Sequence, residues 1–207
     1  MTWIKICGIT NIEDSLNAAS LGADALGFIF APSPRRVEPR IVREISRSLP
    51  TSILTVGVFV NQDFSVVEEI AASCGLTTLQ FHGDESQEYC RKFSLPVIKA
   101  VRIKNLESIK DVEKYSGVSV LLDTYSPKQA GGTGNLFPWE IALRLKEKRD
   151  FTLSGGLTPL NVGKAIRKVK PWGVDVSSGV ELFPGKKDLL KMMEFIKEVK
   201  KADEATG

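Results

Sequence analysis

The sequence has few of the residues that mark metal-binding or membrane proteins. Its 207 residues include one histidine, His82, and three cysteines, Cys7, Cys74 and Cys90. The cysteines are odd in number and lack the spacing of metal ligands, which favours a reduced, cytoplasmic compartment. No apolar run approaches the ~20 residues that cross a membrane, and no basic-then-apolar leader precedes the first predicted strand. We therefore expect a cytoplasmic protein that has no metal site and no membrane contact.

An excess of charge of one sign is lacking too. The chain has 28 Lys and Arg residues against 25 Asp and Glu residues, a formal net charge of +3, and the signs are interspersed. Adjacent basic residues, such as those at 35–36, 186–187 and 200–201, are spread along the chain. A nucleic-acid-binding domain would gather basic residues on one face, so no nucleic-acid partner is expected. The hydrophobic content of 43% is enough for one sizeable core.

Segments typical of strands and helices alternate along almost the whole chain. Strands are predicted at residues 3–7, 24–30, 53–60, 77–82, 96–101, 118–123, 151–154 and 172–176. The first helix is predicted to begin near Thr10 or Asn11, because Thr10 has capping-box spacing to Glu13. Further helices are predicted at residues 41–49, 64–72, 85–93, 105–115, 139–146, 160–169 and 188–200.

Eight strand–helix units with short links predict an α/β fold, a single closed eight-stranded parallel barrel of the (βα)8 or TIM type. An open doubly wound sheet is the alternative, but eight regular units in so short a chain favour closure. We expect residues 1–207 to form one barrel domain, with residues 202–207 as a frayed end.

The first predicted strand carries a candidate catalytic thiol. Side chains alternate along a strand, so Lys5 and Cys7 share one face, and Cys7 is the last inward residue before a sharp turn at Gly8. Loops that follow such strands commonly carry active residues; the ordinary alternative is a small buried thiol. Lys5 and Asp175 would both face the barrel interior on strands that closure makes neighbours. Because a buried lysine is costly without a partner, we predict an ion pair between them.

Two turns rich in glycine and serine follow the seventh and eighth predicted strands. In (βα)8 barrels these loops commonly form a phosphate site, with a short helix that points its N-terminus inward. The candidate phosphate-binding residues are Gly155 and Gly156 after the seventh strand, Ser177, Ser178 and Gly179 after the eighth, and Gly132 in the long loop after the sixth. The alternatives are tight turns that need glycine for positive φ and, for the long loop, a flexible surface segment instead of a hinged lid.

Three more polar residues are expected at the same, C-terminal end of the barrel. Asp123 ends an apolar strand, and such surroundings favour a protonated carboxyl, which suits a general acid. A helix cap or loop tether is the alternative for Asp123. Arg36 is able to grip a carboxylate with two hydrogen bonds, although a solvated arginine pair is the ordinary explanation. His82 either contacts substrate, titrates, or is satisfied within the barrel.

Taken in order, these motifs resemble those of the phosphoribosylanthranilate isomerase family. The matching segments are KICGIT at residues 5–10, GFIF at 27–30, VGVFVN at 56–61, QFHG at 80–83, LLDT at 121–124, GGTG at 131–134, LSGGL at 153–157 and DVSSGVE at 175–181. A single motif would be weak evidence, but the ordered set runs from the first strand to the loop after the eighth. The resemblance implies a (βα)8-barrel enzyme of tryptophan biosynthesis that uses no cofactor. Its partner would be a phosphorylated small molecule, and the sequence leaves monomer and homodimer open.

The resemblance also implies an activity and residue roles. The family converts N-(5-phosphoribosyl)anthranilate to 1-(2-carboxyphenylamino)-1-deoxyribulose 5-phosphate by an Amadori rearrangement. Cys7 matches the family's general base, Asp123 its general acid and Arg36 the arginine near the anthranilate carboxylate, while the role of His82 stays open. The glycine and serine turns match the phosphate cup. Burial should raise the pKa of the Cys7 thiol, and Lys5 should oppose that rise.

Two rival functions are open. A related sugar-phosphate isomerase of histidine biosynthesis runs the same rearrangement on a similar barrel, but it resembles a two-aspartate design where this chain has Cys7. A non-catalytic sensor of phosphorylated metabolites would keep the phosphate turns without needing Cys7 and Asp123.

Overall fold

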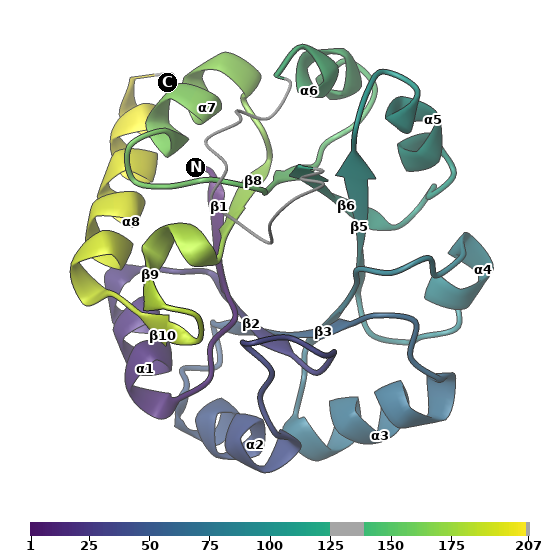
Figure 1. Ribbon diagram of the computed structural model, residues 1–207, viewed down its shortest axis with the longest axis vertical. Coiled ribbons are helices and arrows are strands. Elements are labelled where there is room, and N and C mark those ends of the chain that lie inside the picture. The colour runs from purple at the N-terminus through teal and green to yellow at the C-terminus, as the bar shows by residue number, and fades with distance from the viewer. Residues whose placement is uncertain (125–138, 206–207) are drawn as a thin grey trace.

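In the computed structural model, which describes residues 1–124 and 139–205, eight parallel strands close into a barrel in sequence order. The strands are β1 Trp3–Cys7, β2 Ala25–Ile29, β3 Leu54–Phe59, β4 Thr78–Phe81, β5 Val97–Ile103, β6 Ser119–Thr124, β7 Thr152–Leu153 and β8 Gly173–Val176. The barrel closes where β1 pairs with β8, and helices surround the strands (Figure 1). The predicted closed barrel is confirmed, and the open doubly wound sheet is excluded.

The helices follow the strands along the chain and lie outside the barrel. They are α1 Ile12–Leu21, α2 Pro39–Ser48, α3 Phe64–Cys74, α4 Gln87–Cys90, α5 Ser108–Glu113, α6 Trp139–Lys146, α7 Val162–Val169 and α8 Leu189–Glu204. α1 begins within the predicted range: Asn11 is its N-cap, and the side chain of Asn11 accepts a hydrogen bond from the Asp14 N–H.

Several helices differ in length from the prediction, and α4 and α8 are two of them. α4 has only four residues and begins after its cap, Ser86. Glu85 lies before this cap and accepts hydrogen bonds from the backbone N–H groups of Asn61 and Gly83. α8 continues to Glu204, and Ala202 within it is fully buried. The prediction that the chain frays from residue 202 is therefore wrong for residues 202–204, which belong to α8.

A short hairpin between β8 and α8 was not predicted. The 3-10 helix η1 Ser178–Val180 is followed by the antiparallel strands β9 Glu181–Phe183 and β10 Lys186–Lys187. The turn between them has Gly185 at φ 89°. The hairpin lies beside α1, where Lys186 forms ion pairs with Glu13 and Asp14. It brings buried charged groups close to the end of β1.

The alternation of β1 separates apolar side chains from the polar interior. Ile4 and Ile6 belong to the large apolar layer between strands and helices. Lys5 and Cys7 face the other way, into the barrel. The apolar interior is small and consists of Ala25, Val56, Ile98, Ala100 and Leu121, with Trp3 packed against it. The barrel therefore has room for charged side chains at its C-terminal end.

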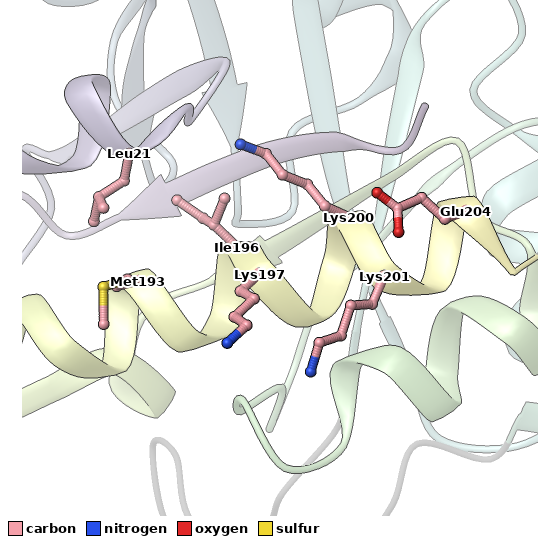
Figure 2. A pocket seen from close by; sticks show the side chains of 7 residues that line it. All are labelled: Leu21, Met193, Ile196, Lys197, Lys200, Lys201 and Glu204. Carbon is pink, nitrogen blue, oxygen red and sulfur yellow. The ribbon is translucent and has the colours of Figure 1, made fainter.

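Two surface hollows lie away from this end. One is a groove between the end of α1 and α8, lined by Leu21, Met193, Ile196, Lys197, Lys200, Lys201 and Glu204 (Figure 2). The other is lined by the N-terminal residues and Trp172. Neither hollow is lined by Cys7, His82 or Asp123. In the described ranges, no helix is long and apolar enough to span a membrane.

Candidate active site

The four predicted catalytic and substrate-binding residues lie at the C-terminal ends of barrel strands. Cys7 is the last residue of β1, and Gly8 turns the chain with φ 77°. Arg36 lies in the loop after β2 and forms a backbone bridge with Ile29. His82 directly follows β4, and Asp123 is next to last in β6.

Cys7 lies in a buried, charged environment. Its neighbour Lys5 is completely buried, and Lys5 Nζ lies 2.7 Å from Asp175 Oδ1, so the predicted ion pair is confirmed. Asp175 Oδ2 accepts a hydrogen bond of 3.0 Å from the Ser154 hydroxyl at the end of β7. Burial raises the pKa of the Cys7 thiol, while the charge of Lys5 opposes that rise. The resting thiol is therefore harder to ionise than a free cysteine.

Asp123 is less enclosed than its apolar strand indicated. Its side chain is 25% exposed, and Asp123 Oδ2 lies 3.1 Å from His82 Nε2. His82 Nδ1 in turn lies 3.4 Å from Gln80 Nε2. The three interpretations of His82 did not include a contact with the candidate acid, Asp123, and the structure shows one. Gln80 is buried, so it holds one side of the imidazole ring in place.

The adjacent arginines have different surroundings. Arg35 makes hydrogen bonds from Nε and from Nη2 to the carboxylate of Glu181, and its side chain is only 12% exposed. Arg36 is exposed, and its guanidinium makes no ion pair with another described residue. A solvated pair is thus wrong for Arg35, because a partner 146 positions away buries it. The guanidinium N–H groups of Arg36 are therefore accessible to a group outside the described residues.

Glu181 also pairs with a second buried lysine, Lys187. The sequence interpretation missed both residues. Lys187 Nζ donates to Glu181 Oε1 at 2.8 Å and to the backbone carbonyl of Ser177 at 3.2 Å. Burial lowers the pKa of Lys187, and Glu181 opposes that change. The pKa of Glu181 is lowered: burial acts to raise it, but hydrogen bonds from Arg35 and Lys187 outweigh burial. The sequence signal for this hairpin was the Pro-Gly turn at residues 184–185.

The turns after β7 and β8 pack against each other. Gly155 and Gly156 have φ of 82° and 69°, so both adopt the left-handed conformation that favours glycine. A Cβ on Gly179 would lie 1.9 Å from the Leu157 carbonyl oxygen, so only glycine allows this approach. Ser178 begins η1, the short helix expected at this position. Gly132, in the long loop, lies outside the described residues.

One hydroxyl at these turns lacks a partner. Ser177 Oγ is buried and makes no hydrogen bond with another described residue. It lies 3.1 Å from the position that a Cβ on Gly8 would take, so the turns after β1 and β8 meet here. No group of three or more side chains suited to a metal ion occurs in the described part of the chain.

The fold, with titratable side chains at the C-terminal rim of the strands, defines a (βα)8-barrel enzyme. A model of the family described as N-(5'phosphoribosyl)anthranilate (PRA) isomerase matches residues 4–198. The chain belongs to this family and is an isomerase.

Relatives support the assignment over nearly the whole chain. The N-(5'-phosphoribosyl)anthranilate isomerase of Pelobacter propionicus is 48% identical over 97% of this chain and 96% of its own. The phosphoribosyl anthranilate isomerase of Thermotoga maritima is 44% identical, with a TM-score of 0.93, over 97% of this chain and 100% of its own. A further isomerase structure contains reduced 1-(o-carboxyphenylamino)-1-deoxyribulose 5-phosphate. It has 43% identity and a TM-score of 0.89, over 97% of this chain and 100% of its own.

Proposed function

We propose that this chain converts N-(5'-phosphoribosyl)anthranilate to 1-(2-carboxyphenylamino)-1-deoxyribulose 5-phosphate in tryptophan biosynthesis, by general acid–base catalysis. The observation that carries this proposal is the order of the strands. Cys7 ends β1 and Asp123 lies near the end of β6, and the glycine turns follow β7 and β8, which lie between them in the barrel. A sugar held by its phosphate at those turns has one candidate catalytic residue on each side, Cys7 on β1 and Asp123 on β6.

Proton transfer divides between these two residues. Asp123 protonates the furanose ring oxygen, which opens the ring to a Schiff base. Cys7, as thiolate, then takes the C2′ proton, and the resulting enolamine tautomerises to the ketone. One group must start with its proton and the other without, so different environments are required. The two environments differ, because Asp123 lies beside His82, whereas Cys7 lies next to the buried ion pair of Lys5 and Asp175.

The phosphate binds at the turns after β7 and β8. The backbone N–H groups of Gly155 and Gly156 make no hydrogen bond with another described residue, and the left-handed glycines leave the backbone open to an anion. The unpartnered hydroxyl of Ser177 supplies a further donor. Ser178 and Gly179 begin the short helix beside it. Gly132, outside the described residues, stays a predicted phosphate-binding residue.

The anthranilate carboxylate is held on the other side of the mouth. Arg36 is exposed near the end of β2 and is free to pair with a carboxylate through two hydrogen bonds. His82 contacts Asp123 and helps to orient the substrate. This arrangement puts a cation where the substrate has its second negative group.

A turnover assay tests the proposal. The purified chain is mixed with N-(5'-phosphoribosyl)anthranilate, and the loss of anthranilate-type fluorescence is followed. We expect turnover that falls by about 10²–10⁴-fold or more in the Cys7→Ser and Asp123→Asn variants. Binding without turnover would identify a phosphometabolite sensor instead. Turnover of the histidine-pathway aminoaldose alone would identify the related sugar-phosphate isomerase.

A further inference from the structure

The buried lysines differ in how their ammonium groups are satisfied. Among the described residues these are Lys5, Lys99 and Lys187. Lys99 Nζ donates to the carbonyl oxygens of Phe81, Gly83 and Ala100 and to Glu85. Lys187 Nζ donates to two oxygens. Lys5 Nζ donates to a single oxygen, that of Asp175, although an ammonium has three donors. Lys5 thus has donors on its ammonium group that no described oxygen accepts.

The space beside Lys5 is shared with the sulfur of Cys7. Gly27 on β2 pairs with Cys7 in register. A Cβ on Gly27 would lie 2.7 Å from Cys7 Sγ and 3.1 Å from Lys5 Nζ. The ammonium and the sulfur are therefore near neighbours around one point, and they have this room because residue 27 has no side chain.

The charges around Cys7 leave one anion missing. The cations are Lys5 on β1, Arg35 after β2 and Lys187 on β10, and each is stabilised by a charge on Cys7. The carboxylates are Asp175 on β8 and Glu181 on β9. A thiolate would be the third anion and would balance the cluster. Farther out, Asp14 on α1 is engaged by Lys186 and by the backbone of residue 187.

Lys5 is the cation best placed to hold this anion. Burial alone would lower the pKa of Lys5, but attraction to Asp175 and Cys7 outweighs burial and raises it. Burial lowers the pKa of Lys187, and Arg35 donates to Glu181 from Nε and Nη2. Lys5 stays charged, and it is held from behind by Asp175 and Ser154.

We infer that Lys5 is a positioning residue whose buried ammonium is the counter-ion for the Cys7 thiolate, in a pocket that Gly27 opens and Asp175 fixes. The inference rests on the proposed function, because it explains how Cys7 ionises to act as the base. When Cys7 takes the C2′ proton, the thiolate becomes a thiol and the ion pair with Lys5 is released.

The test is the pH dependence of Cys7 in Lys5→Met, which keeps the length of the side chain and removes its charge. Alkylation of Cys7 by iodoacetamide is measured across pH and located by peptide mass spectrometry. An opposite charge nearby moves a pKa by roughly 1–3 units, so we expect the alkylation profile to shift upward by at least about one unit. The acid limb of kcat/KM should move with it, and activity should recover at high pH. A purely structural loss would lower the rate at all pH values.

Lys99→Met is the matched control. Lys99 is equally buried and paired with Glu85, so its loss should destabilise the fold without moving the Cys7 profile. If Lys5→Met does not fold, Asp175→Asn is compared with Lys5→Met/Asp175→Asn, which leaves no unpaired carboxylate, and the same upward shift is expected.

The outcomes separate the two proposals. Identical alkylation profiles with and without Lys5 would overturn its role as counter-ion, even if the wild type turns over substrate. If the wild type is inactive but Lys5→Met still shifts the alkylation profile of Cys7, the proposed function is overturned and the ion pair between Lys5 and Cys7 stands.

Discussion

His82 Nε2 lies 3.1 Å from Asp123 Oδ2, so the residue after β4 contacts the carboxylate on β6 across the intervening strand β5. Gln80, buried in β4, lies behind the ring with its amide 3.4 Å from Nδ1. The three side chains form a row from the barrel interior to its mouth. The imidazole and the carboxylate are 24% and 25% exposed, so substrate has access to both.

Removing this contact should impair Asp123 without abolishing catalysis. We expect His82→Asn to lower kcat by up to about tenfold, because an ordinary hydrogen bond contributes about 0.5–1.5 kcal/mol. His82→Gln, whose amide reaches closer to the Nε2 position, should lose less. Steady-state kinetics on both variants checks this. A His82→Asn loss as large as that of Asp123→Asn would make His82 the acid itself.

Gly156 should be required for phosphate affinity. It has φ 69°, and a Cβ there would meet nothing within 4 Å, so a methyl group would project into the open space assigned to the phosphate. We expect Gly156→Ala to raise KM at least about tenfold, the equivalent of ~1.4 kcal/mol. It should also lower the free energy of unfolding by about 1–2 kcal/mol through strain at positive φ.

Gly75→Ala is its control. Gly75 ends α3 with φ 65°, and a Cβ there also meets nothing within 4 Å. The strain is therefore matched, but KM should stay at the wild-type value. Equal KM changes in both variants would remove Gly156 from the phosphate site.

Glu181 should stabilise the fold in a pH-dependent way. Glu181→Gln leaves Arg35 and Lys187 without their shared carboxylate, and breaking such a buried pair costs about 3–5 kcal/mol. The pKa of Glu181 is lowered from 4.5 in the folded chain, since hydrogen bonds from Arg35 and Lys187 outweigh burial. Its contribution is therefore complete above 4.5 and is lost as pH falls through the lower folded pKa.

Urea unfolding of wild type and Glu181→Gln at descending pH measures this contribution. The difference between the two should be largest near neutral pH and should shrink below 4.5. Glu44→Gln is the control, because Glu44 makes only an exposed contact with Arg40, and its loss should change stability little at any pH. A pH-independent difference for Glu181→Gln would contradict the argument.

The barrel and the Lys5–Asp175 pair were predictable because both depend on local patterns that closure combines. Alternation in β1 puts Lys5 on the inner face, and closure makes β8 its neighbour, so the partner follows without coordinates. The alternation of strands and helices likewise indicated eight units. The start of α1 was predictable only as Thr10 or Asn11, because both are good caps and only geometry selects Asn11.

The Pro-Gly pair at residues 184–185 signals a turn, but the short strands beside it and their buried charges were not predictable from local patterns. β9 and β10 have three and two residues, too few to show a period, and Leu182 and Phe183 are exposed. Lys187 belongs to a basic pair that resembles a solvated surface, but contact with Glu181 buries it. Arg35 is buried by the same carboxylate from far along the chain. Long-range partners of this kind leave no local signal.

The two candidate catalytic residues give the sharpest test of the mechanism. Asp123→Asn keeps its shape but has no carboxyl proton to give, and Cys7→Ser replaces a thiolate with a far poorer base. General acid or base groups contribute about 10²–10⁴-fold, so we expect each variant to lose kcat in or above that range, with KM changed little. Both should stay folded, because each change is nearly isosteric, and thermal unfolding checks this.

The double variant and the pH profile decide whether Cys7 and Asp123 act together. Cys7→Ser/Asp123→Asn should lose less than the product of the single losses, because residues that act as a unit are not additive. Burial raises the pKa of Cys7, so wild-type activity should fall as pH falls and the thiol stays protonated. This acid limb should be absent from the residual rate of Cys7→Ser. If Cys7→Ser keeps most of the wild-type kcat, Cys7 is not the base, and His82, the only histidine of the chain, becomes the next candidate.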